Sequence, residues 1–421
     1  MKVTTEQSDH DIGPETPLTL ALPRSTCGSR DVPDFSDLVI SSAGETRRPD
    51  VTESASEMHD LAYGLIRVLD EDGRAVGPWV TTIDQSLLIK GLTSMMLTRE
   101  YDRRMLLAQR QAKTSFFMQS TGEEAISTAF RFALRDDDMN FPTYRQQALL
   151  IAGGYPLELM MSQIFSNSHD PLRGRQLPGL YSAREFGFFS LSGNVATQFV
   201  QAVGWAMATA MKGGDSITAA WIGEGSSAES DFFSAMLMAS TYRAPVILNL
   251  INNQWAISTS QAVTQGQAAT FAVRGHGFGL PSLRVDGNDF LAVYAVAAWA
   301  IERARRNLGP TFVEWVTYRV GAHSSSDDPS AYRPKSEPSA WPLGDPIERL
   351  KNHLIAIGAW THDEHTHLEA RVAEQVQLAQ ATAEGWGTLK SGPGPSPRDL
   401  FEDVYAEVPD HLVRQRREAG L

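Results

Sequence analysis

The 421-residue sequence lacks a second cysteine, an apolar run long enough for a membrane helix, and an excess of basic residues. Its single cysteine, Cys27, excludes an intrachain disulfide, which is compatible with a reducing compartment, and with no histidine nearby it is interpreted as an incidental thiol. Because no stretch reaches roughly 20 apolar residues and the acidic N-terminus has no apolar signal core, we expect a cytoplasmic protein without a membrane partner. The net charge of −13 argues against a nucleic-acid partner, since nucleic-acid-binding surfaces are basic.

The length and composition are typical of a globular protein with more than one structural unit. Hydrophobic residues make up 42% of the chain and charged residues 21%, which excludes wholesale disorder. Changes in composition and hydrophobic pattern along the sequence predict three units: an irregular N-terminal extension over residues 1–83, an α/β domain over 84–338, and a helical region with a tail over 339–421. Within the extension, residues 61–70 predict a strand followed by a turn at Asp72 and Gly73.

The centre of the chain alternates short apolar runs with helical patterns. Apolar runs predict strands within residues 216–223, 245–253, 282–289 and 311–319. Apolar spacing predicts helices over 84–111, 227–244 and 289–306. Strands that alternate with helices predict an α/β fold in which a parallel sheet is flanked by helices on both faces. Ligands of such sheets bind at the carboxyl ends of the strands.

A carboxylate and two amides follow neighbouring predicted strands. Glu224 comes at the end of one strand, before a glycine turn and a helix, and Asn252 and Asn253 end the next. A helix start reached through a glycine turn favours phosphate. Glu224 would repel a diphosphate unless a cation lies between them. Carboxylate, amide and carbonyl oxygens suit octahedral Mg²⁺, so the spacing favours a magnesium–diphosphate site.

Two alternatives stay open from the spacing alone. The run from Gly223 through Gly225 to Ala228 fits the degenerate dinucleotide-binding fingerprint. That fingerprint requires an acidic residue at the end of the next strand, where this chain has two asparagines. The other alternative is a tight strand–helix turn that binds nothing.

The stretch from Gly223 to Ser258 resembles the thiamine diphosphate motif, in which Gly-Asp-Gly is followed by Asn-Asn, with Glu224 in place of the usual aspartate. From about residue 84 onward, the ordered motifs are similar to those of the alpha subunits of bacterial branched-chain 2-oxo acid dehydrogenases. The resemblance implies the thiamine-diphosphate-binding fold. It also implies an Mg²⁺ held by the side chains of Glu224 and Asn253 and by the backbone carbonyl of Trp255.

The resemblance implies further contacts with the cofactor. Residues near the diphosphate would be Tyr144, Arg145, Gly225 and Ser226, and a guanidinium fork is well shaped for phosphate. The loop 191–198 would pass beneath the thiazolium ring, with Gly193 and Val195 at the cofactor and Val195 supporting its bent form. This loop can also hold a structural K⁺ through Ser192, Asn194, Thr197 and Gln198.

The resemblance assigns the catalytic role to His323, with Arg319 orienting its loop. A histidine can donate to an oxyanion or move a proton near neutral pH. Taken singly, His323 also fits a solvated loop histidine and Arg145 an ordinary surface ion pair. Four other histidines are interpreted as solvent-facing rather than metal ligands: His353, His362, His365 and His367.

The chain departs from its relatives at several positions. Ala322 stands where some have a second histidine, Ile251 where some have an arginine near the diphosphate, and Gly193 where a serine lies in the thiazolium loop. Ser324 occupies a position that is phosphorylated in mitochondrial relatives, whereas the second such position is Pro334. We therefore do not expect control by a kinase.

The implied activity is oxidative decarboxylation of 2-oxo acids derived from valine, leucine and isoleucine, with transfer of the acyl group to the lipoyl group of an acyltransferase (E2). The glutamate that activates the cofactor's aminopyrimidine would come from a beta subunit, which implies an alpha2-beta2 heterotetramer. Pyruvate or acetoin dehydrogenase is the alternative within the same enzyme group. A non-catalytic phosphate-binding or assembly protein is the alternative from another class.

Overall fold

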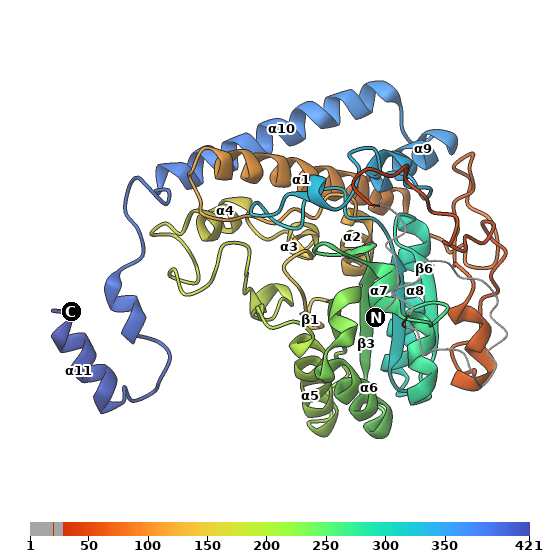
Figure 1. Ribbon diagram of the computed structural model, residues 1–421, viewed down its shortest axis with the longest axis horizontal. Helices are drawn as coiled ribbons and strands as arrows, with labels where there is room; N and C mark the ends of the chain where they lie inside the picture. The colour runs from red at the N-terminus through yellow and green to blue at the C-terminus, as the bar shows by residue number, and fades with distance from the viewer. Residues whose placement is uncertain (1–19, 21–27) are drawn as a thin grey trace.

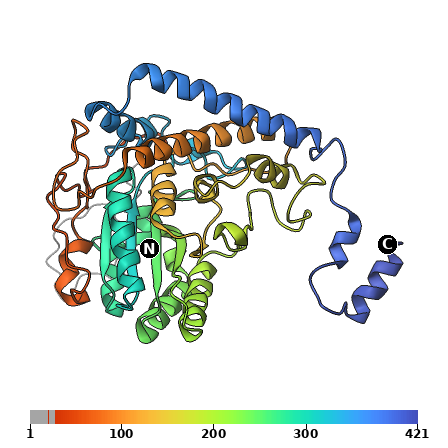
Figure 2. The ribbon, with the colours of Figure 1, turned by 180° about the vertical axis from the view of Figure 1, so that it is seen from behind.

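The computed structural model describes residue 20 and residues 28–421 (Figure 1). The interpretation of Cys27, and much of the predicted extension, lie outside these residues. A sheet with its covering helices forms the body, two long helices run along one side of it, and the chain ends in an arm that projects away (Figures 1 and 2). Among the described residues, none of the helices combines the length and the hydropathy that crossing a membrane requires.

Five parallel strands form the sheet, in the order β1-β2-β3-β7-β6. The prediction of a parallel α/β fold is confirmed. The strands are β1 (Met139–Phe141), β2 (Thr218–Gly223), β3 (Val246–Asn252), β6 (Ser282–Asp286) and β7 (Thr311–Val316).

Helices cover both faces of this sheet, as the alternation along β2 illustrates. Ala219 and Trp221 pack into one buried cluster, Ala220 and Ile222 into another, because successive side chains of a strand point to opposite faces. The first cluster includes α1 (Gln85–Arg110), α2 (Glu124–Ala133) and α8 (Phe290–Arg305). The second includes α5 (Thr197–Met211) and α6 (Ser230–Tyr242).

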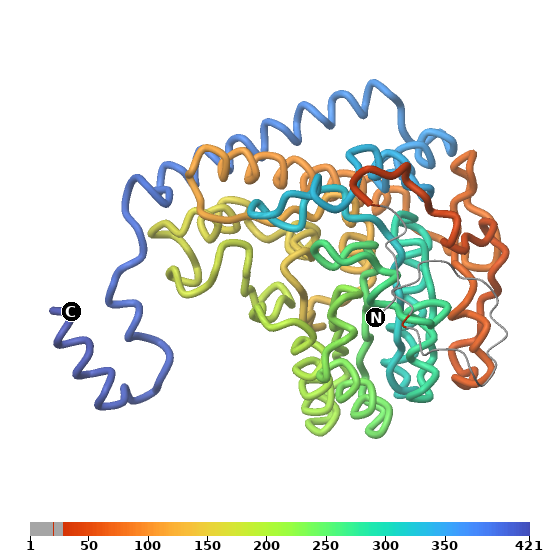
Figure 3. The backbone as a smooth tube through the Cα atoms, in the orientation of Figure 1, coloured from red at the N-terminus to blue at the C-terminus, as the bar shows by residue number. Residues whose placement is uncertain are grey.

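The N-terminal segment lies against α8 and the edge strand β6, at one end of the molecule (Figure 3). The prediction of a strand over 61–70 is wrong in extent: a 3-10 helix, η1, occupies Ala55–Ala62, and only isolated bridges follow. The cause is Asp289, whose carboxylate accepts from the amides of Val68 and Leu69 at 2.8 and 2.6 Å and replaces a strand partner. The turn at Gly73 is confirmed, with φ of +75°.

The C-terminal region is helical, as predicted. Asp345 caps α9 (Pro346–Ala356), and Thr361 caps α10 (His362–Gly385), which packs along α1. The interpretation of all four histidines here as solvent-facing is wrong for two of them. His353 is buried with Nδ1 2.8 Å from the carbonyl oxygen of Gly73, and His365 lies on the buried side of α10.

Short elements complete the described chain. The helices are α3 (Gln147–Ala152), α4 (Leu157–Phe165), α7 (Gln261–Gln265) and α11 (Asp410–Glu418), and the strands are β4 (Trp255–Ala256) and β5 (Thr259–Ser260). The 3-10 helices besides η1 are η2 (Arg184–Phe186), η3 (Glu224–Ala228), η4 (Ala272–Phe278), η5 (Pro329–Ala331), η6 (Pro338–Ala340) and η7 (Pro397–Phe401). No residue of η7 or α11 is buried, so the arm they form has no core of its own.

Asn249, fully buried in the central strand, provides a test of this core. Its Oδ1 accepts from the indole of Trp315 at 2.9 Å, and its Nδ2 donates to the carbonyl of Ala220 at 3.1 Å. We expect Asn249→Leu to lower the free energy of unfolding by about 1–3 kcal/mol, because the buried indole N–H loses its acceptor. Urea denaturation measures the change. Asn352→Leu, at an exposed position of α9, is the control and should shift stability by less than about 0.5 kcal/mol; equal midpoints for the two variants would contradict the expectation.

Candidate functional site

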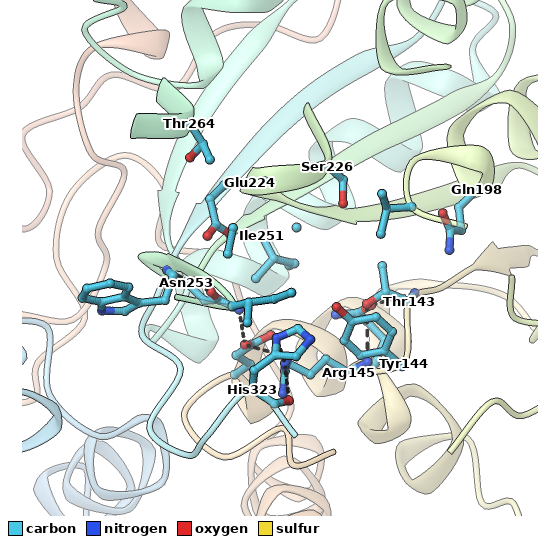
Figure 4. A pocket seen from close by; sticks show the side chains of 18 of the residues that line it. Thr143, Tyr144, Arg145, Gln198, Glu224, Ser226, Ile251, Asn253, Thr264 and His323 are labelled. Atoms are coloured by element: carbon cyan, nitrogen blue, oxygen red, sulfur yellow. Dashed lines mark hydrogen bonds and ion pairs between the residues drawn. The ribbon is translucent and has the colours of Figure 1, made fainter. Parts of the chain in front are cut away.

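A cavity of about 490 Å³ opens where β2 and β3 end, as predicted for a parallel sheet (Figure 4). It brings together most of the residues that the sequence pointed to: Tyr144, Arg145, Ser192, Gly193, Val195, Gln198, Glu224, Gly225, Ser226, Asn253, Trp255 and His323. Three predicted residues do not line it, namely Asn194, Thr197 and Arg319.

Glu224 follows β2 and is 1% exposed. Its Oε1 is buried without a hydrogen-bond partner, and burial raises the pKa of this carboxyl to about 7. The glycine turn expected after it is the 3-10 helix η3, and α6 follows from Ser230. Gly225 is required there, since a Cβ would lie 2.5 Å from the Cβ of Ala256. An orphaned buried carboxylate oxygen of this kind is costly unless it is protonated or binds a cation.

Asn253 and Trp255 reach the cavity from the end of β3. Gln254 between them has φ of +75°, an uncommon value for a residue other than glycine, and this bend turns both of its neighbours to the cavity. The Asn253 Nδ2 donates to Glu123 Oε1 at 2.7 Å. The Trp255 carbonyl accepts from Arg319 Nη1 at 2.7 Å and keeps a second lone pair.

Arg145 determines the tautomer and the charge of His323. It is 4% exposed, so the alternative of a surface ion pair is wrong. One amino group, Nη2, donates to the His323 carbonyl at 2.8 Å and lies 3.1 Å from Nδ1 of the ring. Because a guanidinium only donates, Nδ1 must accept, which leaves the ring proton on Nε2. Burial, helped by the charges of Arg145 and Arg319, lowers the pKa of His323 to about 3, so the ring is neutral.

Arg319 does not line the cavity but binds the segments that form its wall. Its guanidinium donates to the carbonyls of Trp255 and Ile257 at 2.7 and 2.8 Å and to the Tyr332 hydroxyl at 2.9 Å. Tyr332 in turn donates to Asp327 at 2.6 Å, and the same carboxylate accepts from the His323 amide at 2.7 Å. Arg319 therefore joins the strand end to the histidine loop as a positioning residue.

The loop 191–198 is closed by its own hydrogen bonds. Gln198 Nε2 donates to the Ser192 carbonyl at 3.2 Å, and Thr197 Oγ1 donates to the Asn194 carbonyl at 2.8 Å. Gln198 Oε1 is buried and has no partner. Val195 reaches the cavity with 43% of its surface exposed.

The structure also describes the positions at which the chain departs from the family pattern. Ile251 lines the cavity where an arginine would reach the diphosphate, and a side chain at Gly193 would meet nothing within 4 Å. Ser324 is largely buried, and its Oγ accepts from the Ser326 amide at 3.2 Å.

Sequence reasoning missed one charged residue of the cavity. Glu123 is 3% exposed, lines the cavity and has an unpartnered Oε2. The available signal was Gly122 followed by two glutamates at the start of a helical pattern. Thr143, Ile257 and Thr264 also line the cavity and were not predicted.

Comparisons with known proteins agree with this geometry. The family model "Dehydrogenase E1 component" matches residues 92–391, and "2-oxoisovalerate dehydrogenase E1 alpha subunit N terminal" matches residues 16–56. The 2-oxoisovalerate dehydrogenase subunit alpha of Pseudomonas aeruginosa is 58% identical over 96% of this chain and 99% of the relative. The chain belongs to the family of 2-oxoisovalerate dehydrogenase alpha subunits.

Eukaryotic members of this E1 alpha family are more distant. The mitochondrial 2-oxoisovalerate dehydrogenase subunit alpha of Mus musculus is 38% identical over 84% of this chain and 78% of its own length. The mitochondrial subunit alpha 1 of Arabidopsis thaliana is 35% identical over 84% of the chain and 74% of its own length. E1 dehydrogenases depend on thiamine diphosphate, and an E1 alpha subunit implies a beta subunit and an E2 partner.

The role of Arg319 is tested by Arg319→Lys, which keeps the charge but removes the fork. We expect amide hydrogens in residues 255–258 and 323–333 to exchange about tenfold faster, because the single nitrogen of lysine cannot span the acceptors that the two amino groups of Arg319 reach separately. Hydrogen–deuterium exchange measures this. Arg74→Lys, at a position with 72% of its side chain exposed, is the control; equal exchange in the two variants would exclude a positioning role.

Proposed function

We propose that the chain is the alpha subunit of a 2-oxoisovalerate dehydrogenase (EC 1.2.4.4) that oxidatively decarboxylates branched-chain 2-oxo acids and passes the acyl group to the lipoyl group of E2. Thiamine diphosphate and Mg²⁺ are its proposed cofactors, and the cytoplasm is its predicted compartment. The observation that carries the proposal is the buried, unpartnered oxygen of Glu224 beside Asn253, at the strand ends of an E1 family fold.

The residues of the cavity fit a diphosphate and a divalent cation. The side chains of Glu224 and Asn253 and the carbonyl of Trp255 offer three oxygen ligands of the kind that Mg²⁺ prefers. A cation there would keep Glu224 ionised against the effect of its burial. Tyr144, Arg145, Gly225 and Ser226 remain the proposed diphosphate contacts. K⁺ binding at the loop 191–198 is supported by the unpartnered Gln198 Oε1.

His323 is proposed to act as a neutral hydrogen-bond donor. When bound, thiamine diphosphate supplies the electron sink for decarboxylation. The chain contributes a ring whose Nδ1 is held by Arg145 and whose proton is on Nε2. Nε2–H can then donate a hydrogen bond to an oxygen that gains negative charge. The T-shaped contact with Tyr144, at 5.8 Å between ring centroids, limits rotation of the ring.

A beta subunit is the proposed partner that completes the site. In the described part of the chain, the carboxylates of the cavity are Glu123 and Glu224. The first is bonded to Asn253 and the second is proposed for the cation. The resemblance to the family implies that the glutamate for the aminopyrimidine comes from the beta subunit. The arm supports an assembly, because Leu400, Val404 and Tyr405 expose 70%, 63% and 54% of their surfaces on it. We propose an alpha2-beta2 heterotetramer that works with the lipoyl domain of E2.

The proposed activity is tested by co-expression with the candidate beta subunit. Thiamine diphosphate, Mg²⁺ and an artificial electron acceptor would be supplied, and 2-oxoisovalerate and pyruvate compared. We expect a clear preference for 2-oxoisovalerate, and Glu224→Ala should lower kcat/KM on the order of 100-fold or more, since metal sites stabilise several kcal/mol of charge. A preference for pyruvate would overturn the substrate. A complex with no metal-dependent cofactor binding would favour the phosphate-binding or assembly protein.

The role of His323 is tested by His323→Ala and His323→Gln. We expect the alanine variant to lose about 10²–10³-fold in acylation of the E2 lipoyl domain, the usual contribution of one hydrogen-bond donor to an oxyanion. The glutamine variant, whose amide N–H can still donate, should retain more activity. Mass spectrometry of the lipoyl domain gives the rate. Unchanged acylation in the alanine variant would exclude the role.

A further inference from the structure

Glu123 contacts the side of the cavity that carries Asn253 and the side that carries Arg145. Its Oε1 accepts from Asn253 Nδ2 at 2.7 Å, and the same oxygen lies 3.9 Å from Nε of Arg145. Arg145 in turn holds His323. One buried carboxylate therefore contacts a proposed metal ligand and the arginine of the proposed diphosphate contacts.

The backbone turn that carries Glu123 is rigid. Gly122 has φ of +101°, and a Cβ there would lie 2.2 Å from the carbonyl oxygen of Tyr318, so the turn packs directly on the chain beyond β7. Asp102, buried in α1, accepts from the amide and hydroxyl of Ser120 at 2.7 and 2.9 Å, and the Glu123 amide donates to the Ser120 carbonyl at 2.9 Å. The backbone that carries the carboxylate is thus held by the chain at Tyr318 and by the chain at Ser120.

The contact with Asn253 decides which atom of that amide faces the cavity. A carboxylate oxygen accepts, so the NH₂ of Asn253 turns to Glu123 at 2.7 Å, and Oδ1 turns away from it, with only a long contact of 3.4 Å from the Trp255 amide. An asparagine without such a partner can present either its oxygen or its nitrogen to a cation, and only the oxygen binds a hard cation. Partners of metal ligands commonly fix orientation in this way.

We propose that Glu123 is the positioning residue of the cation site, orienting the Asn253 amide so that Oδ1 faces the cation. This inference rests on the proposed function, because it takes the cation to bind between Glu224 and Asn253. Glu123 acts in this arrangement through Oε1, which accepts from Asn253, whereas its Oε2 has no partner in the described chain. Its second contact, with Arg145, ties the cation side of the cavity to the side that holds His323.

The test compares Glu123→Met with Glu123→Gln in the full alpha–beta complex. Methionine has a similar volume and no acceptor, whereas glutamine keeps an acceptor and loses the charge. Mg²⁺ is titrated in the presence of thiamine diphosphate, and quenching of tryptophan fluorescence reports binding without turnover. We expect Glu123→Met to raise the half-saturating Mg²⁺ concentration about 10- to 100-fold, the usual effect of removing a ligand's partner. Glu123→Gln should stay within about threefold of the unaltered complex.

Two controls separate orientation from general disruption. Asp138→Asn removes another buried carboxylate, which pairs with Arg305 before β1 and away from the cavity, and should leave Mg²⁺ binding unchanged. In an Asn253→Ala background, Glu123→Met should add little, because the amide that it orients is gone. Glu123→Ala serves if the methionine variant fails to assemble.

The proposal is overturned if Glu123→Met binds Mg²⁺ like the unaltered complex, if Glu123→Gln is as impaired as Glu123→Met, or if the Glu123→Met effect is undiminished in the Asn253→Ala background. A different result marks failure of the proposed function itself: the unaltered complex then binds thiamine diphosphate equally well with and without Mg²⁺. That comparison is made before any variant of Glu123 is interpreted.

Discussion

Charge buried at the carboxyl edge of the sheet is the constraint on which the site depends. Glu123, Glu224, Arg145 and Arg319 are each at most 4% exposed there, and a buried charge is costly unless it is paired. The two arginines are paired mainly with backbone carbonyls and a histidine, which fixes three loops around the cavity. The two carboxylates each keep an oxygen without a partner. The terminal amino groups of the two arginines are thus bonded within the protein, although Arg319 Nε has no partner, whereas each carboxylate leaves an oxygen open to a cation.

The pairing of arginines with carbonyls explains how an irregular segment can hold His323 in a fixed position. The chain from Arg319 to Gly321 belongs to no helix or strand, so its carbonyls lack ladder partners. Arg333 supplies them: its guanidinium donates to the carbonyls of Arg319, Val320 and Gly321 at 2.7–2.9 Å. His323 therefore leaves this segment at a fixed point, and Arg145 sets its ring. The position of the histidine is a product of arginine geometry rather than of secondary structure.

Whether a feature of the fold or of the site could be predicted depends on how far apart in the sequence the interacting residues lie. Periodicity predicts the helix from Asp84 and the strands that end at Gly223 and Asn252. The rule that parallel strands end at one edge then predicts that Glu224 and Asn253 lie close together. The contact of Asn253 with Glu123 spans 130 positions and depends on a turn packed against β7, which no local pattern encodes. The failed strand over 61–70 has the same cause, since the Asp289 carboxylate that captures its amides lies 220 positions away from Leu69. Sequence patterns located the strand ends, but the partners of buried polar groups required the fold.

The distribution of satisfied and unsatisfied groups also indicates how cofactor and partner combine. The side of the cavity that holds His323 is already bonded within the chain, so ordering it costs little when a cofactor binds. Cation binding stabilises the carboxylate side most, because the cation contacts an oxygen that otherwise has no partner. Such an unpartnered oxygen destabilises the unliganded fold. Ligands that bind only the folded state stabilise it by mass action. A partner subunit that closes the cavity over the cofactor excludes water and strengthens these contacts. Cofactor binding and subunit assembly should therefore reinforce each other, since a closed interface excludes water from the contacts that the cofactor makes with these buried charges.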